Sequence, residues 1–295
     1  MRWCVVGLML FAGLSAPWDV RADQLQLASV HAQVMDLSTG DVLFSKLERE
    51  AVPVASITKL MTALVVLEAE LPLDEWLTIV PRATPAPRNA YSRLRPDSQA
   101  QRADLLRMAL SSSENLAAYQ LGHHYPGGMA AFVSAMNAKA QQLGMHNTRF
   151  VDTTGLSEDN RSTAEDLLLL LRAAWQSPQI HELSTTGSYS VRFRAPTYRL
   201  QFGNTNPLVR RGDWDVQLSK TGYLDVAGRC LVMVMDVAER PMAVVLLNSF
   251  GTRSPIGDAG RIRRWLETGD PGRVAGPALE YEQRASAVYR NSGSN

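Results

Sequence analysis

Cysteine is almost absent from this 295-residue chain, which contains only Cys4 and Cys230. Cys4 lies in an N-terminal segment that we expect to be removed, so Cys230 has no partner for an internal disulfide, and no cysteine cluster exists to bind zinc. Cys230 stands in the apolar run 230–237, where a buried and inert thiol is expected. The fold must rely on its apolar core, and we predict neither a metal site nor a cofactor.

An excess of either charge is also missing. The 30 lysines and arginines nearly balance the 29 aspartates and glutamates, which gives a formal net charge of +1. A broad basic surface for nucleic acid is not expected from this balance. Hydrophobic residues make up 45% of the chain, which is enough to build one large globular domain.

An apolar run stands near the N-terminus, where the sequence reads MRWCVVGLMLFAGLSAPWDVRA. Arg2, the apolar stretch 4–14 and the small-residue site at 20–22 are typical of a secretory signal. We predict a signal peptide over residues 1–22, cleaved after Ala22, and export to the periplasm. The alternative is a membrane anchor, but the apolar stretch is well short of the roughly 20 residues that a spanning helix needs.

Lysine is the scarcest basic residue. The chain has five histidines, and most of its other basic residues are arginine. The lysines are Lys46, Lys59, Lys139 and Lys220. Arginine stays charged in proteins, so it cannot replace an amine that must lose its proton. Lys59 and Lys220 both stand in short motifs described below, which indicates that the chemistry there requires an amine.

The hydrophobic pattern predicts strands at both ends of the chain and helices between them. An α+β fold is expected, with the N- and C-terminal strands sharing one sheet. The predicted hairpins are 30–44 and 231–247, and the clearest predicted helices are 129–143, 163–175 and 258–266.

Three short motifs with chemical potential follow in order. Ser56-x-x-Lys59 opens an apolar run at helical spacing, so the two side chains share one face of the first turn. Ser113-x-Asn115 interrupts a helical stretch, and Lys220-Thr221-Gly222 ends a predicted strand. Each motif alone could be an ordinary cap or turn, but the ordered trio is typical of penicillin-binding proteins and class A β-lactamases.

A hydroxyl beside an amine is the minimum apparatus for nucleophilic catalysis without histidine. Ser56 would attack an amide carbonyl and become acylated, and Lys59 would accept its proton. Lys59 must then be neutral, so its pKa must fall from about 10.4. Burial and a nearby second cation, for which Lys220 is the candidate, would both lower it.

The remaining motif residues suit the substrate. Ser113 can relay a proton to the leaving amine, and Asn115 can hold the substrate amide and orient the base. Thr221 and its neighbour Lys220 can bind a carboxylate. Gly222 lets a substrate backbone lie against the strand. The backbone N–H groups of the nucleophile and of Tyr223 are the candidate oxyanion donors.

Beyond these motifs, the sequence resembles the D-alanyl-D-alanine endopeptidases among the low-molecular-mass penicillin-binding proteins, the subgroup numbered seven and eight. The resemblance covers about residues 30–269. The stretches that carry it are VPVASITKLMTALVVLEAELPLDEWLTI, LSSSENLAAYQLGHHYPGG, AMNAKAQQLGMHNTRFVDTTGLS, FGNTNPLV and LSKTGYLDVAGRCLVM.

This resemblance implies a DD-peptidase/β-lactamase-like fold, with an antiparallel sheet flanked by helices, a helical lobe, and the active site between them. It implies a peptidase whose partners are peptidoglycan peptide stems, with β-lactam antibiotics as covalent inhibitors and other cell-wall enzymes as further candidates. Carried onto this chain, Ser56 is the nucleophile, Lys59 the proton acceptor, Ser113 a further active-site residue and Lys220 a substrate-binding residue.

Two departures from the carboxypeptidase pattern favour the endopeptidase subgroup. Glu114 stands where carboxypeptidases commonly have glycine in the second motif. Carboxypeptidases also carry a second β-rich domain and an amphipathic anchor, and residues 269–295 are too few and too polar for either. We therefore expect a DD-peptidase catalytic domain over 23–268, a polar, disordered tail over 269–295, and no stable membrane anchor.

Three alternatives remain open. A DD-carboxypeptidase fits because Lys220 could bind the carboxylate of either substrate. A class A β-lactamase ranks lower because Glu158 and Asp159 lack the glutamate–asparagine spacing of that class. A catalytically silent scaffold that binds peptidoglycan would belong to another class, and the intact trio argues against it.

Two other features have ordinary interpretations. His123 and His124 belong to no metal or triad motif, so packing and loop roles are expected for them. Residues 152–155, Asp-Thr-Thr-Gly, fit either a turn or a border of the cleft.

Overall fold

The structure is a computed structural model that describes residues 25–83 and 90–292. The predicted signal peptide, residues 1–22, lies outside the described residues. Across the described ranges, no helix is both long and apolar enough to span a bilayer.

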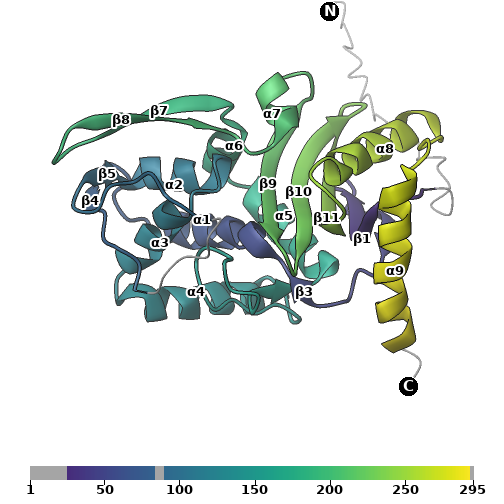
Figure 1. Cartoon of the computed structure of the whole chain (residues 1–295), viewed down its shortest axis with the longest axis horizontal. Coiled ribbons are helices and arrows are strands. Elements are labelled where there is room, and N and C mark those ends of the chain that lie inside the picture. Colours follow the sequence, from purple (N-terminus) through teal and green to yellow (C-terminus); the bar gives the residue numbers. More distant parts are fainter. Residues whose placement is uncertain (1–24, 84–89, 293–295) are drawn as a thin grey trace, which may run out of the picture.

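A five-stranded antiparallel sheet joins the two ends of the chain, as the sequence predicted. Its order is β2-β1-β11-β10-β9, so the N-terminal hairpin and the C-terminal strands are directly hydrogen-bonded neighbours (Figure 1). β9 forms one edge of this sheet. The strands are β1 Ser29–Asp36, β2 Val42–Lys46, β9 Val216–Leu224, β10 Gly228–Val237 and β11 Arg240–Ser249.

The alternation of side chains along β10 and β11 builds two cores. Even-numbered positions of β10, such as Val232, face the core that contains the helical lobe, and odd-numbered positions such as Met233 face the other core. Helix α5 (Ala164–Trp175) covers the first face, and helix α8 (Ser254–Thr268) covers the second with its buried Trp265. Both faces of the sheet are therefore covered, which explains the nearly continuous apolar runs of these strands.

The middle of the chain forms a helical lobe beside the sheet (Figure 1). Its first helix, α1, lies at the centre, and nine of its eleven residues are buried. This helix spans Thr58–Glu68. The other helical elements are η2 Ala55–Ile57, α2 Arg102–Ser111, α3 Asn115–His123, α4 Gly128–Gln142, α6 Pro178–Thr185 and α7 Pro207–Arg211.

The described residues also form three two-stranded antiparallel sheets. The longest of them is the hairpin of β7 and β8, which extends over α2 (Figure 1). The pairs are β3 Val52–Pro53 with β6 Arg161–Ser162, β4 Trp76–Thr78 with β5 Gln99–Gln101, and β7 Ser188–Phe193 with β8 Tyr198–Gly203.

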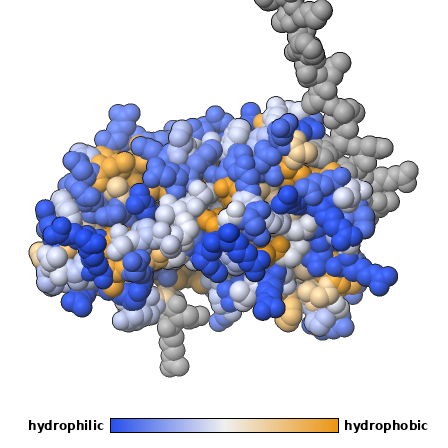
Figure 2. Space-filling model, turned by 90° about the horizontal axis from the view of Figure 1, so that it is seen from above, coloured by the Kyte–Doolittle hydropathy of each residue, from blue (hydrophilic) through white to orange (hydrophobic). Residues whose placement is uncertain are grey.

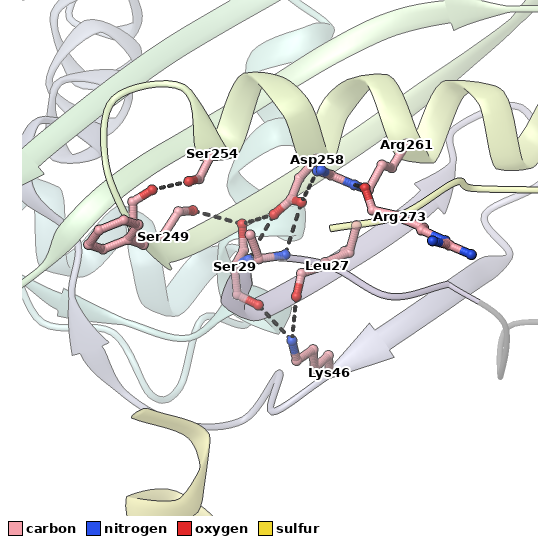
Figure 3. Close-up of polar contacts among 10 residues, drawn as sticks. Leu27, Ser29, Lys46, Ser249, Ser254, Asp258, Arg261 and Arg273 are labelled. Atoms are coloured by element: carbon pink, nitrogen blue, oxygen red, sulfur yellow. Dashed lines mark hydrogen bonds and ion pairs between the residues drawn. The ribbon is translucent and has the colours of Figure 1, made fainter. Parts of the chain in front are cut away.

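A buried polar cluster ties the start of β1 to α8 (Figure 3). Both oxygens of the fully buried Asp258 accept hydrogen bonds from the backbone N–H groups of Ala28 and Ser29, at 2.9 and 2.7 Å. The Ser29 hydroxyl donates to Asp258 at 2.6 Å and lies 2.7 Å from the Ser249 hydroxyl of β11. Because Arg261 pairs with the same carboxylate, the buried charge is compensated.

The prediction of a disordered tail is wrong. Gly276–Ser292 form helix α9, which packs against β1. Glu282 and Ser286, one turn apart, are buried against the domain, and Glu282 forms an ion pair with Lys46 at 2.9 Å. The buried face of this helix carries Glu282 and Ser286 beside the small Ala278, so the sequence shows no clear apolar stripe there.

The face seen in Figure 2 is mostly hydrophilic, with small, separate hydrophobic patches. This pattern is usual for a domain whose apolar side chains are largely used in its cores.

Candidate active site

Ser56 lies in η2, a single 3-10 turn that leads into α1. The residue before it, Ala55, has a φ of +47°, a conformation that costs a non-glycine residue roughly 1–2 kcal/mol. Gly155 presses on this turn so closely that a β-carbon there would lie 1.9 Å from the Ala55 carbonyl oxygen. The strained turn is therefore held by its neighbours.

The Lys59 amine lies behind Ser56, in the first turn of α1. Its Nζ donates to the Ser56 hydroxyl at 2.8 Å, to Asn115 Oδ1 at 2.8 Å and to the Thr154 carbonyl at 2.6 Å. Lys59 is fully buried, and no carboxylate in the described part of the chain lies within ion-pair distance of it. All three of these acceptors are neutral.

The Lys59 pKa is lowered to about 7, chiefly because burial penalises the charged amine. Asp152 and Glu114 raise the pKa, and Arg82 lowers it. Burial is thus the main cause, and the nearby cation is Arg82. The sequence predicted that Lys220 would help to lower the pKa of Lys59, but Lys220 is not among the causes of that shift. The effect is seen on Lys220 itself, whose pKa is lowered first by burial and then by the Lys59 charge.

A second hydroxyl–lysine pair faces the first. Lys220, on β9, is buried, and its Nζ donates to the Ser113 hydroxyl at 2.9 Å and to the Thr221 carbonyl at 2.8 Å. Ser113 has a φ of +56° in the turn between α2 and α3. The structure therefore joins residues of the three motifs into two hydroxyl–lysine pairs, Ser56–Lys59 and Ser113–Lys220.

The edge strand β9 lies against the turn that carries Ser56. A β-carbon on Gly222 would lie 3.2 Å from both the Ser56 nitrogen and the Val54 carbonyl oxygen, tighter than most contacts of real side chains. Glycine therefore allows the strand to approach Ser56. Tyr223 follows; it is 40% exposed, and its hydroxyl donates to Asp225 at 2.6 Å.

A cleft of about 510 Å³ opens over these groups. All eight site residues predicted from the sequence come together here, with Lys59 and Lys220 buried behind the serines. The six that line the cleft are Ser56, Ser113, Asn115, Thr221, Gly222 and Tyr223.

Sequence reasoning missed three contributors. Thr154 supplies an acceptor to Lys59, and Gly155 supports the Ser56 turn. Thr205 lines the cleft, and its hydroxyl accepts from Thr221 at 2.6 Å. The signals were present, in Asp-Thr-Thr-Gly at 152–155, which was left open as turn or cleft border, and in the stretch FGNTNPLV.

The histidines take packing roles, as expected. His123 stacks on Tyr119 with ring centroids 5.9 Å apart, and a ring nitrogen of His124 lies 2.8 Å from the Thr78 carbonyl oxygen. Within residues 25–83 and 90–292, no group of three or more His, Cys, Asp or Glu side chains could hold a metal ion.

Known proteins that resemble this chain are DD-peptidases, in agreement with the serine–lysine site. The family model described as D-alanyl-D-alanine carboxypeptidase matches residues 19–251. The chain is 49% identical to a D-alanyl-D-alanine endopeptidase of Escherichia coli K12, over 92% of this chain and 88% of that protein. It is 50% identical to the corresponding enzyme of Pseudomonas aeruginosa, over 88% and 83% of the two chains. A Bacillus subtilis D-alanyl-D-alanine carboxypeptidase is 30% identical, over 80% and 60%.

Solved structures share the fold. A mutant of the Streptomyces K15 DD-transpeptidase superposes with a TM-score of 0.76 at 26% identity, covering 82% of this chain and 98% of that one. Penicillin-binding protein D2 of Listeria monocytogenes, in its cefotaxime-bound form, gives 0.70 at 28% identity, over 83% and 98%. The architecture is therefore the α+β DD-peptidase fold.

Proposed function

The chain belongs to the D-alanyl-D-alanine carboxypeptidase family of serine peptidases, and we propose that it is the endopeptidase type of DD-peptidase, which cleaves peptide cross-links of peptidoglycan through an acyl-enzyme on Ser56. The observation that carries this proposal is the Ser56–Lys59 pair at 2.8 Å, with a buried amine that has only neutral acceptors.

In the first step, the Ser56 oxygen attacks the D-alanine carbonyl carbon while its proton passes to neutral Lys59. The backbone N–H groups of Ser56 and Tyr223 are the donors to the carbonyl oxygen as it becomes negative. Gly222 supports this assignment, because its closeness to the Ser56 nitrogen brings the strand and the turn together.

In the second step, the tetrahedral intermediate collapses and the scissile C–N bond breaks. Ser113 passes its hydroxyl proton to the departing amine and regains one from Lys220, whose Nζ lies 2.9 Å away. The proton that Lys59 took from Ser56 replaces the one that Lys220 gave up, which leaves Lys59 neutral again. Water then attacks the ester, Lys59 accepts the water proton and returns it to the Ser56 oxygen, and the acid and the free hydroxyl are released. Asn115 orients Lys59 through its Oδ1 and also lines the cleft, where it can hold the substrate amide.

The substrate's free carboxylate suits Lys220 and Thr221. In a cross-link this carboxylate belongs to the D-centre of diaminopimelate, beside the scissile amide. A terminal D-alanine offers a carboxylate in the same position, so these two residues do not distinguish the substrates. The preference for cross-links comes from the relatives named endopeptidases, which are 49 and 50% identical to this chain, against 30% for the Bacillus carboxypeptidase.

This function requires an exported protein whose substrate is peptidoglycan, which agrees with the predicted signal peptide and periplasmic location. β-Lactams are the proposed covalent inhibitors, because penicillin-binding protein D2, of the same fold, is known in ampicillin-bound and cefotaxime-bound forms.

The test uses mature protein and its Ser56→Ala variant with cross-linked dimers, pentapeptide monomers and labelled penicillin. Dimer cleavage and labelling that both vanish in Ser56→Ala support the proposal. Release of D-alanine from monomers without dimer cleavage would replace it with the carboxypeptidase function. Absence of labelling in the parent protein would overturn the assignment of Ser56.

A further inference from the structure

A second pocket, of about 360 Å³, adjoins the active-site cleft. The two share Ser113 and Asn115, but Ser56 and Gly222 line only the cleft. The second pocket therefore adjoins the Ser113–Asn115 turn, and Ser56 is not among its lining residues. We call it the distal pocket; its further lining residues are Tyr91, Arg93, Ser112, Glu114, Phe202 and Gly203.

The walls of the distal pocket are fastened to one another. The Ser112 hydroxyl donates to the Gly203 carbonyl at 3.0 Å, which holds the turn to the end of β8. The Glu114 carboxylate accepts from the Ala117 N–H and from the Ser92 side chain. A glycine at position 114 would lack this carboxylate, so Glu114 links the turn to the segment that carries Tyr91 and Arg93.

Arg93 provides the exposed charge of the distal pocket. Its guanidinium lies over the Phe202 ring, 4.9 Å from the centroid, and one of its nitrogens donates to the Gln201 carbonyl at 2.6 Å. These two contacts hold a long side chain in one orientation, so less entropy is lost when it binds an anion. The other charged lining residue, Glu114, is already hydrogen-bonded within the turn.

The chemistry of the reaction decides what reaches this pocket. Ser113, in the proposed mechanism, gives its proton to the departing amine, so the leaving fragment must lie beside Ser113. A leaving D-alanine is a single residue. The leaving fragment of a cross-link is a whole peptide stem, which ends in a free carboxylate and needs additional room.

We propose that the distal pocket is the binding site for the departing peptide stem of a cross-link, with Arg93 bound to a carboxylate of that stem and the rings of Tyr91 and Phe202 against its backbone. This inference rests on the proposed function and adds a substrate-selecting residue, Arg93, that belongs to none of the three motifs.

The test compares Arg93→Ala with Arg95→Ala on three substrates: cross-linked dimers, pentapeptide monomers and labelled penicillin. Arg95 is a matched control, because it lies on the same segment and covers the Tyr198 ring at 4.6 Å without lining the pocket. We expect Arg93→Ala to lower kcat/KM for dimers by about tenfold, the size of one charge-assisted hydrogen bond. The loss should be confined to dimers, since penicillin and monomers have no departing stem.

A second measurement changes the substrate instead of the protein. Dimers whose departing stem ends in a carboxamide should be cleaved by the parent enzyme about tenfold more slowly, and Arg93→Ala should not distinguish the two dimers. Equal losses on all substrates in Arg93→Ala, or no loss on dimers, would overturn the distal-pocket proposal. If the parent protein cleaved no dimers at all, the proposed function itself would fail.

Discussion

Two lysines, one fully buried in the active site and one half-buried on the sheet, have different kinds of partner. Lys59, in the active site, donates to a hydroxyl, an amide oxygen and a carbonyl. Lys46, on β2, donates to the carbonyls of Leu27 and Ser29 and forms an ion pair with Glu282 of α9 at 2.9 Å (Figure 3 shows its carbonyl contacts).

Burial lowers the pKa of both amines, but the Glu282 carboxylate raises that of Lys46 through a hydrogen bond and its charge. At Lys59 the more distant Asp152 and Glu114 leave the pKa at about 7. The comparison shows how one residue type serves two purposes. An amine with only neutral acceptors can lose its proton and act as a base, whereas an amine with a carboxylate partner fixes a helix to the domain.

The largest expected effect is that of Lys59→Arg. Arginine keeps the positive charge but cannot give up its proton, so acylation by labelled penicillin should fall about 10³-fold or more. Lys139→Arg is the matched control, since Lys139 pairs with Glu68 on the outside of the lobe and should leave acylation unchanged. An active Lys59→Arg enzyme would contradict the role of Lys59 as the base.

The pH dependence of acylation should follow the Lys59 pKa of about 7. Below that pH the amine is protonated and cannot accept the Ser56 proton, so the rate should rise about tenfold per pH unit and level off above pH 7. Stopped-flow acylation with penicillin from pH 5 to 9 measures this. A rate that is flat over the whole range would contradict a Lys59 base with a pKa of about 7.

Glu282, the ion-pair partner of Lys46, should affect the free energy of unfolding and leave acylation of Ser56 unchanged. Glu282→Gln removes the charge that compensates Lys46, and the free energy of unfolding should fall by about 2 kcal/mol, less than for a fully buried pair. Denaturant unfolding and penicillin labelling of the same samples test both halves. Lost labelling in a folded Glu282→Gln protein would mean that the two sites are coupled.

Removing an exposed ion pair should change the free energy of unfolding much less than removing the Lys46–Glu282 pair. Arg263 and Glu267 lie one turn apart on α8, at 2.8 Å, and both are more than a third exposed. Glu267→Gln should lower the free energy of unfolding by no more than about 0.5 kcal/mol. A change as large as that of Glu282→Gln would show that burial does not set the strength of these pairs.

The sequence could predict those parts of the fold in which local pattern and burial agree. The sheet that joins both termini followed from alternating apolar runs, and the helix predicted over 163–175 from its apolar spacing is α5, with Thr163 as its N-cap. Helix α9 did not follow, because Glu282 and Ser286 occupy its buried face and their partners lie far away in the sequence.

The site was predictable to the extent that its chemistry depends on residue type. The scarcity of lysine identified Lys59 and Lys220, and the motif spacing identified their serines. The stretch 152–155 was left open as a turn or a border of the cleft. The contacts of Thr154 and Gly155 could not be assigned from it, because they are a hydrogen bond to a carbonyl and a close backbone contact formed only in the fold. The cause of the lowered Lys59 pKa was also only partly foreseen, since burial outweighs the neighbouring cations.

The most direct test of Lys59 as the base is an NMR titration of the lysine amines, which is feasible because the chain has only four lysines. Protein labelled with ¹³C at the lysine ε-carbon is titrated from pH 5 to 11, and the Lys59 signal is identified as the one absent from Lys59→Arg. We expect this signal to titrate near pH 7, because burial lowers the pKa of Lys59. A Lys59 signal that titrates near the ordinary lysine value of about 10.4 would contradict it.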